Sequence, residues 1–423
     1  MRFTYSTVGL MLFACILMLT LTAPLHAAAA CRGFVITKAL PKATGGQTIS
    51  TTQELSAALK NAQGGETFLL AGGNYGALRV RQSFKKPVTI RSADPQSPAC
   101  LTELRVTKSS NITFDGLVFD YVRSPGDKVH VIRFEIRNSH GITISNSIFD
   151  GDYNAGTGFG RGIFIRDSSK ITISGNILRK WLRAITAVHT TFLTIRGNQI
   201  YDIRADGMAF SGIDDVLIER NTVHNFRAGS TRDHRDMIQL MRTTNTRSTN
   251  VVIRDNVFDM GAGDYTQTIF MGASGKDTSN PQLRHQNILI ENNVIYNAHL
   301  HGISVHGVDD LSIRKNSIIR IPISNSGQVT IPRINVSSST SVVIEQNAVS
   351  EIVGYENQRD WAVVNNALIQ DLSPSRGGYY NREFIVYKTG SANGFHEYGV
   401  RPGSEVDRLK AGSTLVRNYP TQR

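Results

Sequence analysis

Four ionisable residues stand together at Asp233-His234-Arg235-Asp236, in a segment that interrupts an otherwise regular repeat. A histidine titrates close to neutral pH, so His234 is the natural candidate for a base that removes a proton. Clustered carboxylates suit a hard cation, which makes Asp206, Asp233 and Asp236 candidate ligands for Ca²⁺. This segment therefore predicts a site for proton transfer, with Ca²⁺ as a candidate cofactor and no cofactor as the alternative.

A second pattern of charges extends this candidate site along the chain. When the repeats are aligned, Arg161, Arg183, Asp206 and Asp236 occupy the same position in consecutive units, and His301 follows further on. Charges are not buried unpaired in a core, so we expect this column to lie at the entrance of the strands, facing a groove or the turn. The candidate catalytic residues are His234, Arg235, Asp236, Arg183 and Lys276. The candidate substrate-binding residues are Arg161, Tyr153, Gln239, Arg284 and His301.

These residue types suit β-elimination on an acidic sugar polymer. That reaction needs a cation against the sugar carboxylate, a base for the C5 proton and an acid for the leaving oxygen. Arg183 or a bound Ca²⁺ supplies the first requirement and His234 the second, with Lys276, Arg235 and Tyr153 as further candidates. Three alternatives stay open: a C5-epimerase, a hydrolase that uses Asp206 and Asp236 as paired carboxylates, and a glycan-binding solenoid without catalysis.

The repeat predicts the fold that positions these residues. Short segments such as Ile171-Thr-Ile-Ser-Gly-Asn176 and Leu193-Thr-Ile-Arg-Gly-Asn198 alternate apolar and polar residues, which is the period of a strand, and each ends in Asn. Several of these Asn residues are 22 or 23 positions apart, and no helical pattern lies between the strands. Strands at that period predict a parallel β-helix, an all-β solenoid with coils about 4.8 Å apart. A second strand in each coil should stack inward at Ile163, Ile185, Met208, Ile238, Ile269 and Ile303.

Insertions mark one side of this solenoid. Segments 150–160, 229–235, 240–251 and 271–288 lengthen coils around the second strand. Loops that rise on both sides of one face form a groove across several coils, which suits an extended polymer more than a compact metabolite. We therefore expect an acidic polysaccharide as the partner and a monomeric protein.

The first 30 residues read as an export signal. Arg2 precedes an apolar run from Val8 to Leu21, and Pro24 and four alanines follow. No other apolar stretch reaches the roughly 20 residues that a membrane-spanning helix needs. We expect a periplasmic or extracellular protein in which Cys31 and Cys100 form a disulfide, an interpretation favoured over lipid attachment at Cys31.

Composition limits the remaining classes. The 423 residues include 46 Lys and Arg against 34 Asp and Glu, which gives a net charge of +12, and 40% are hydrophobic. That apolar share supports a core and excludes wholesale disorder. Export removes the usual contact with nucleic acid, and the basic residues form no concentrated run, so nucleic acid is not an expected partner.

Four segments follow from these patterns. Residues 1–30 form the signal peptide, and residues 31–65 form an N-terminal cap with a short helix that starts at the capping box Thr51-x-x-Glu54. Residues 66–353 form the β-helix, and residues 354–423 form a C-terminal cap or tail.

The signal, the segment Gly65–Tyr75 and the following coils resemble secreted carbohydrate-active proteins of the pectate-lyase-like superfamily, over most of residues 50–350. The resemblance implies a single-stranded right-handed parallel β-helix. Asp233-His234-Arg235-Asp236 also resembles the Asp-Pro-His-Asp motif of mannuronan C5-epimerases, although His is in second place and Pro is absent. Polygalacturonase-type motifs are represented only by Val308-Asp309-Asp310 and His301-Gly302, which ranks hydrolysis below elimination and epimerisation.

Overall fold

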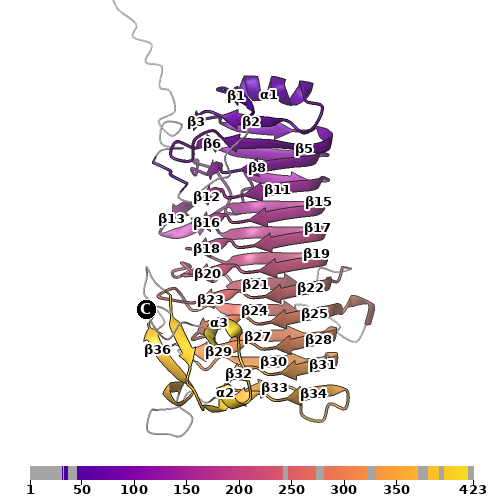
Figure 1. Cartoon of the computed structure of the whole chain (residues 1–423), viewed down its shortest axis with the longest axis vertical. Coiled ribbons are helices and arrows are strands. Elements are labelled where there is room, and N and C mark those ends of the chain that lie inside the picture. The colour runs from indigo at the N-terminus through magenta and orange to yellow at the C-terminus, as the bar shows by residue number, and fades with distance from the viewer. Residues whose placement is uncertain are drawn as a thin grey trace, which may run out of the picture.

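The chain winds into a parallel β-helix in which strands of successive coils stack in three rows (Figure 1). The computed structural model describes residues 31, 33–36, 45–241, 246–272, 281–321, 330–369, 380–389 and 395–417. The predicted signal peptide and Lys276 lie outside these residues. No helix within the described ranges is long and apolar enough to cross a bilayer.

The three rows run the length of the molecule. The first row holds β4 (Ala77–Val80), β7 (Glu103–Thr107), β10 (Phe134–Arg137), the first halves of β15 (Arg161–Ser174), β17 (Arg183–Arg196) and β19 (Asp206–Glu219), and then β21 (Asp236–Met241), β24 (Gln267–Gly272), β27 (His301–His306), β30 (Arg333–Ser337) and β33 (Ile352–Val353). The second row holds β1 (Gln47–Ile49), β2 (Thr67–Leu70), β5 (Ser83–Ser92), β8 (Ser110–Asp115), β11 (His140–Ser145), the second halves of β15, β17 and β19, β22 (Thr249–Arg254), β25 (His285–Glu291), β28 (Val308–Arg314), β31 (Thr340–Glu345) and β34 (Trp361–Val364). The third row holds β3 (Gly73–Asn74), β6 (Ala99–Leu101), β9 (Val118–Asp120), β12 (Ile148–Asp150), β16 (Ile177–Arg179), β18 (Gln199–Tyr201), β20 (Thr222–His224), β23 (Val257–Asp259), β26 (Val294–Asn297), β29 (Ser317–Arg320), β32 (Ala348–Val349) and β35 (Ala367–Leu368).

Apolar residues of all three rows meet in one continuous core. The inward positions predicted for the first row are confirmed, because each of these side chains is at most 1% exposed. Alternation along the strands sends the intervening polar residues outward. Each long strand passes from the first row into the second through a residue with positive φ, namely Asp167, His189 or Gly212.

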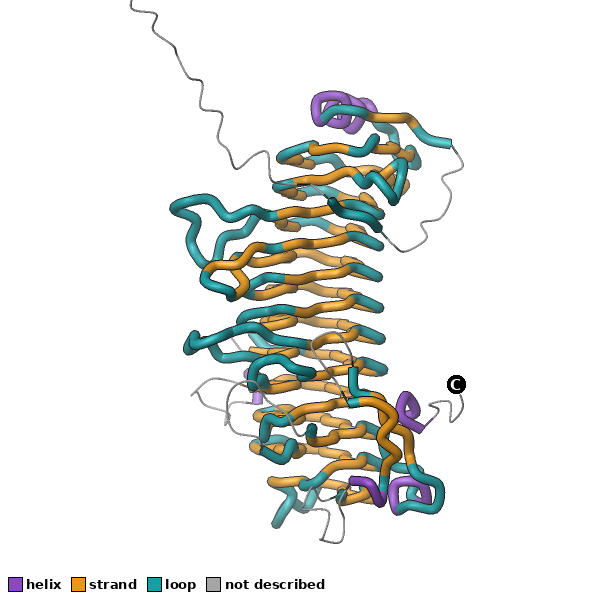
Figure 2. The backbone as a smooth tube through the Cα atoms, turned by 90° about the vertical axis from the view of Figure 1, so that its left-hand side faces the viewer, coloured by secondary structure: helices purple, strands orange, loops and turns teal. Residues whose placement is uncertain are grey.

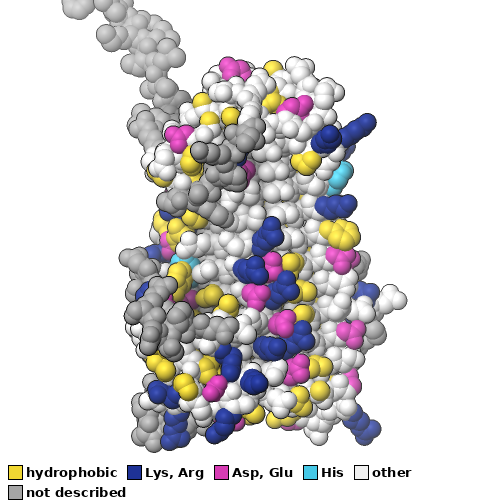
Figure 3. All heavy atoms as spheres, viewed as in Figure 1, with side chains coloured by type: hydrophobic (Ala, Val, Ile, Leu, Met, Phe, Trp, Pro, Cys, Tyr) yellow, Lys and Arg dark blue, Asp and Glu magenta, His cyan; other side chains and the backbone are white. Residues whose placement is uncertain are grey.

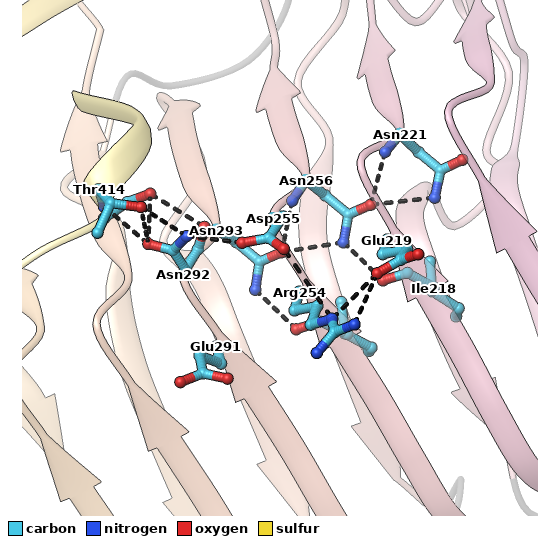
Figure 4. Close-up of polar contacts among 12 residues, drawn as sticks. Ile218, Glu219, Asn221, Arg254, Asp255, Asn256, Glu291, Asn292, Asn293 and Thr414 are labelled. Carbon is cyan, nitrogen blue, oxygen red and sulfur yellow. Dashed lines mark hydrogen bonds and ion pairs between the residues drawn. The ribbon is translucent and has the colours of Figure 1, made fainter. Parts of the chain in front are cut away.

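The Asn that closes each repeat forms a buried ladder along the solenoid (Figure 4). The Oδ1 atom of Asn256 accepts hydrogen bonds from the backbone N–H of Asn221 at 2.9 Å and from its side-chain Nδ2 at 3.0 Å. The Nδ2 atom of Asn256 donates to the carbonyl oxygen of Ile218 and to Asn293 Oδ1, both at 3.0 Å. The side chain thus satisfies backbone and amide groups that have no access to water. The buried ladder members are Asn176, Asn198, Asn221, Asn256, Asn293, Asn316 and Asn347, and half-buried Asn366 ends the ladder.

We predict that Asn256→Ala strongly destabilises the fold. It leaves two buried donors of Asn221 without an acceptor, and each buried unpaired group costs about 1–3 kcal/mol. We expect a loss of about 3 kcal/mol or more in the free energy of unfolding, measured by denaturant unfolding followed by circular dichroism. Asn154→Ala is the matched control at an exposed residue and should change that energy by less than about 0.5 kcal/mol. Equal midpoints for the two variants would show that the ladder contributes nothing.

Charges alternate along the edge of the second row and fix its register. Arg196, Glu219, Arg254, Glu291, Arg314 and Glu345 are consecutive Cα partners in neighbouring strands. Arg254 pairs with Glu219 at 2.9 Å and Arg314 with Glu291 at 2.9 Å. Figure 3 shows the resulting mixture of basic and acidic side chains on this face. A shift by one coil would bring like charges together, so the pattern disfavours misaligned stacking.

The N-terminal end is closed by the predicted cap. Helix α1 (Thr52–Asn61) begins at Thr51, whose side chain accepts from the backbone N–H of Glu54 at 3.1 Å, and Leu55 and Leu59 bury its apolar side. A disulfide joins Cys31 to Cys100. The structure thus contains the cystine favoured from the sequence, and the sulfur of Cys31 is not free for a lipid.

The β-helix continues past the predicted boundary, and a tail follows it. Strands β34 and β35 continue the second and third rows, so the boundary placed at residue 353 is too early. After them come η2 (Tyr380–Arg382), β36 (Phe384–Lys388), β37 (Glu397–Val400), α2 (Glu405–Arg408) and α3 (Thr414–Arg417). This tail lies against the third row (Figure 1): buried His396 contacts Asp259 of β23, and Ser413 donates its backbone N–H to Ser317 of β29.

Loops between the third row and the first project beyond the stack on one side (Figure 2). They include residues 121–131, the hairpin of β13 (Asp152–Asn154) with β14 (Thr157–Phe159), and residues 225–235. A short helix, η1 (Pro281–Leu283), precedes β25. The three projecting loops lead directly into first-row strands. They therefore determine which side chains lie at the start of those strands.

Candidate active site

The charged column predicted from the aligned repeats is present at the start of the first-row strands. Arg161, Arg183, Asp206, Asp236 and Gln267 are Cα partners in consecutive strands. The same row continues through His301 and Arg333. Strands of a sheet are about 4.8 Å apart, so this array presents one polar side chain per coil along the solenoid axis.

Arg183 forms an ion pair with a buried carboxylate. Its Nε donates to Asp206 Oδ2 at 2.5 Å. The side chain of Asp206 is 1% exposed and that of Arg183 is 31% exposed, so the acid lies beneath and the guanidinium reaches solvent. Burial raises the pKa of Asp206 to about 7, against the opposing attraction of Arg183. Arg183 thus presents its positive charge at the surface of the row, and buried Asp206 fixes its position.

His234 is paired in the same manner with Asp236, the carboxylate of the next coil. Its Nδ1 lies 2.7 Å from Asp236 Oδ2, and the same oxygen accepts from Gln239 Nε2 at 2.7 Å. Asp236 is fully buried, whereas the His234 side chain is 55% exposed. The hydrogen bond to Asp236 raises the pKa of His234 above its ordinary value, and burial raises the pKa of Asp236. A carboxylate that accepts from Nδ1–H fixes the ring and directs Nε2 outward.

A glutamine joins this histidine to a second one. Gln267 places its Nε2 at 2.7 Å from His234 Nε2, and its Oε1 at 2.7 Å from His301 Nδ1. Burial lowers the pKa of His301, which favours the neutral ring. A neutral His301 that donates Nδ1–H to Gln267, and a Gln267 that donates to His234, form one continuous chain that ends at Asp236.

The loop before β21 is fixed by hydrogen bonds from the next coil. Asp264 Oδ2 accepts from the backbone N–H groups of Ala228 and Gly229 at 2.6 and 2.8 Å. Further along, Gln267 donates its backbone N–H to the carbonyl of Arg235 at 3.0 Å. The inserted residues that sequence comparison identified are therefore anchored at both ends, and His234 lies between the anchors.

Several predicted site residues lie apart from this row. Asp233 turns away and pairs with Arg204 at 2.7 Å. Tyr153 of the β13–β14 hairpin donates to Asp202 at 3.2 Å. Arg284 pairs with Asp309 at 2.7 Å beside the second row. The structure does not bring these three side chains to His234, because each has an ionic or hydrogen-bonding partner elsewhere.

The predicted Ca²⁺ ligands do not form one cluster. With Asp233 engaged by Arg204, only Asp206 and Asp236 remain as neighbours. Each has a buried Oδ1 without a hydrogen-bond partner. Ca²⁺ takes about six to eight oxygen ligands, so two carboxylates provide an incomplete site. Ca²⁺ binding by Asp206 and Asp236 therefore stays a prediction, and the proposed reaction below does not depend on it.

Sequence reasoning missed three residues of the site. Gln267 and Arg333 continue the column, and their place in the aligned repeat could have identified them. Partial burial lowers the pKa of His130, and the nearby charges of Arg161 and Arg183 lower it further. His130 belongs to a loop outside the repeat, so no alignment of coils could find it.

Comparisons with known proteins agree with this architecture. A family model described as "Right handed beta helix region" matches residues 130–285. The solved structure of a PL6 family alginate lyase, AlyGC, superposes with a TM-score of 0.54 at 16% identity and covers 89% of this chain and 58% of that one. The Dettilon tailspike protein gp208 gives a TM-score of 0.51 at 14% identity over 74% of this chain and 61% of that one. This chain thus spans less than two thirds of either protein. The curated proteins include no match.

Proposed function

We propose an enzyme that cleaves an acidic, uronate-containing polysaccharide by β-elimination, because a right-handed parallel β-helix holds Arg161 and Arg183 at the start of neighbouring first-row strands and His234 against Asp236 of the same row. The observation that carries the proposal is the pairing of two exposed groups, a base and a cation, with buried carboxylates on neighbouring coils. The alginate lyase noted above has the same fold, which makes the proposal compatible with the scaffold.

In the proposed reaction, His234 acts first as the base and then as the acid. Its Nε2 lone pair takes the C5 proton, the C5–H electrons form the C4–C5 double bond, and the C4–O4 bond breaks. The protonated ring then delivers that proton to the leaving oxygen. The substrate must displace the Gln267 N–H that occupies Nε2 in the free protein. Asp236 stabilises the imidazolium formed midway.

Arg183 and Arg161 neutralise the sugar carboxylate in this proposal. The C5 proton is acidic only when the adjacent carboxylate is stabilised as negative charge moves onto it. Arg183 is fixed by Asp206, and Arg161 lies over the Phe164 ring at 5.3 Å from its centroid. Both guanidiniums are therefore oriented before substrate arrives, which avoids a cost of ordering during the reaction.

The same geometry disfavours hydrolysis by Asp206 and Asp236. A retaining or inverting hydrolase needs two carboxyl groups that reach the glycosidic bond. Both side chains are at most 1% exposed and lie beneath Arg183 and His234, so neither offers an oxygen to a sugar. Removal of the C5 proton by His234 would also serve a C5-epimerase, which needs in addition a proton donor on the opposite face of the sugar ring. His301 is the candidate for that role.

Proton NMR of the products discriminates these reactions. Elimination yields vinylic signals of an unsaturated uronate at new chain ends. Epimerisation inverts C5 without new ends, and hydrolysis creates saturated reducing ends. We expect vinylic signals with at least one acidic polysaccharide among alginate, pectate and glycosaminoglycans. A polymer that binds and emerges unchanged would favour the non-catalytic glycan-binding solenoid and contradict an enzyme.

The pH dependence provides a further prediction. Catalysis requires neutral His234, and Asp236 raises the pKa of His234, so kcat/KM should fall as the pH drops through that raised value. In Asp236→Asn the ring loses its anionic partner and the pKa of His234 decreases. The acidic limb of the pH profile should therefore move to lower pH, while the maximal rate declines. A limb that stays in place in Asp236→Asn would show that another group controls it.

Metal removal tests the Ca²⁺ prediction. Because the arginines already supply positive charge and the described carboxylates offer an incomplete site, we expect EDTA to leave the rate within about twofold. Loss of activity in EDTA with recovery in Ca²⁺ would instead assign a cation to the two unpaired Oδ1 atoms of Asp206 and Asp236. Asp206→Asn would then weaken Ca²⁺ binding in a direct titration.

We also propose that the protein acts outside the cytoplasm. The Cys31–Cys100 disulfide suits an oxidising compartment and supports this location. The mass of the mature protein from the culture medium or the periplasm would test both export and removal of residues 1–30.

A further inference from the structure

The outward face of the first row continues upstream of the site as an arginine-rich hollow. Residues Arg79, Arg81, Arg105, Thr107 and Glu135 line a space of about 280 Å³ on strands β4, β7 and β10 and the residue after β4. Arg79, Arg105 and Glu135 are successive Cα partners, and the column passes next to Phe164 of β15. The hollow and the site thus belong to one uninterrupted face.

Positive charge exceeds negative charge on these coils. Glu103 lies within 3.6 Å of Arg79, 2.9 Å of Arg105 and 3.6 Å of Arg133, and Arg133 pairs more closely with Asp127 at 2.9 Å. Glu135 contacts Arg105 at 3.8 Å and Arg137 at 2.7 Å. The two glutamates are 14% and 11% exposed, whereas Arg79 is 74% exposed. The acids are therefore covered, and the cations reach solvent.

Arginines continue from this hollow toward the site. Thr107, Arg137 and Arg166 are neighbouring Cα partners, and Arg161 and Arg183 follow on the same face. The charged edge of the second row differs, because there acids and bases alternate one for one. A surplus of guanidiniums confined to one face, with forks suited to carboxylates, is a recognition surface for anions.

We propose that this hollow, resting on the proposed function, is a distal subsite that binds carboxylates of the same acidic polysaccharide, with the polymer laid along the solenoid axis. Five strand steps separate β7 from β21, a distance of about 24 Å. A polymer of several uronate units can span both places, whereas a trimer bound at His234 cannot. The hollow should therefore govern affinity for long chains and leave short ones unaffected.

The test compares the double variant Arg79→Ala/Arg81→Ala with Arg196→Ala, an exposed arginine of the second row. Both substituted residues follow inward apolar neighbours, Leu78 and Val80, which stay intact. Binding is measured by calorimetry with sodium alginate and with polygalacturonate, and with trimers of each. We expect the double variant to weaken binding of the better polymer about tenfold, with Arg196→Ala and all trimer affinities unchanged. Raising the salt concentration should narrow the difference between the double variant and the parent.

Equal polymer affinity in the parent and the double variant would overturn the subsite, as would parental protein that binds neither polymer. An equal loss in Arg196→Ala would also overturn it, because the effect would then be one of net charge. These outcomes are distinct from failure of the proposed function. If polymer binding weakens in the double variant but the parent shows no turnover, the subsite is supported and the lyase is contradicted. If the parent turns over the polymer and the double variant binds and cleaves it equally well, the lyase is supported and the subsite is contradicted.

Discussion

His234→Ala is expected to abolish turnover while polymer binding persists. General base catalysis contributes about 10²–10⁴-fold, so kcat/KM for the acidic polysaccharide should decrease by that factor. The expectation follows from the exposed ring of His234 hydrogen-bonded to buried Asp236, beside a row whose arginines Arg161 and Arg183 stay in place. Initial rates of formation of unsaturated uronate give the measurement, and calorimetry with the polymer gives the binding control.

Histidine 234 has a matched control in the same molecule. His189 is a half-exposed histidine near Asp167 at the bend between the first and second rows, with Nδ1 at 3.3 Å from the carboxylate. His189→Ala should retain parental rates. Unchanged turnover in His234→Ala would remove this residue from the mechanism, and lost binding in that variant would show that it serves as a contact for the polymer.

Arg183→Ala should be nearly as damaging, with a loss of about 10²–10³-fold in kcat. The guanidinium is the group placed to stabilise negative charge on the sugar carboxylate as the C5 proton leaves. Its removal also strands Asp206 as a buried unpaired carboxylate, which by itself destabilises the protein. The steady-state rate and the melting temperature must therefore be measured together.

The double variant Arg183→Ala/Asp206→Asn separates these two effects. It removes the stranded charge, so the melting temperature should recover toward the parental value while the rate stays low. Recovery of the rate together with stability would contradict a catalytic role for Arg183 and leave it a structural partner of Asp206. Arg183→Lys retains a charge without the planar fork and should show an intermediate rate.

The fold was predictable because its signal is repeated. Each coil repeats the alternation of apolar residues and the closing Asn. A strand that is hard to assign in one coil can therefore be placed by alignment with its neighbours. The inward stack from Ile163 to Ile303 and the capping of α1 at Thr51 both follow from such local rules. The end of the solenoid was misplaced because β34 and β35 follow an irregular segment, although Asn366 still closes their coil.

The site was predictable only where it coincides with the repeat. Aligned coils predicted that Arg183, Asp206 and Asp236 share a column, and the register of the strands confirms it. The partners of side chains in loops were not predictable, since Asp233 could reach either the column or Arg204. Such a choice depends on the path of the inserted loop, which the side-chain carboxylate of Asp264 in the next coil fixes by accepting hydrogen bonds from the loop backbone.

The most direct test of the central claim is ultraviolet absorbance while the purified mature protein incubates with alginate, pectate or a glycosaminoglycan. Elimination creates a C4–C5 double bond conjugated with the carboxylate, so we expect a steady rise in absorbance with one of these polymers and no rise in His234→Ala. A flat trace on all of them, with bound polymer recovered intact, would contradict the assignment of this row as the active site of a lyase.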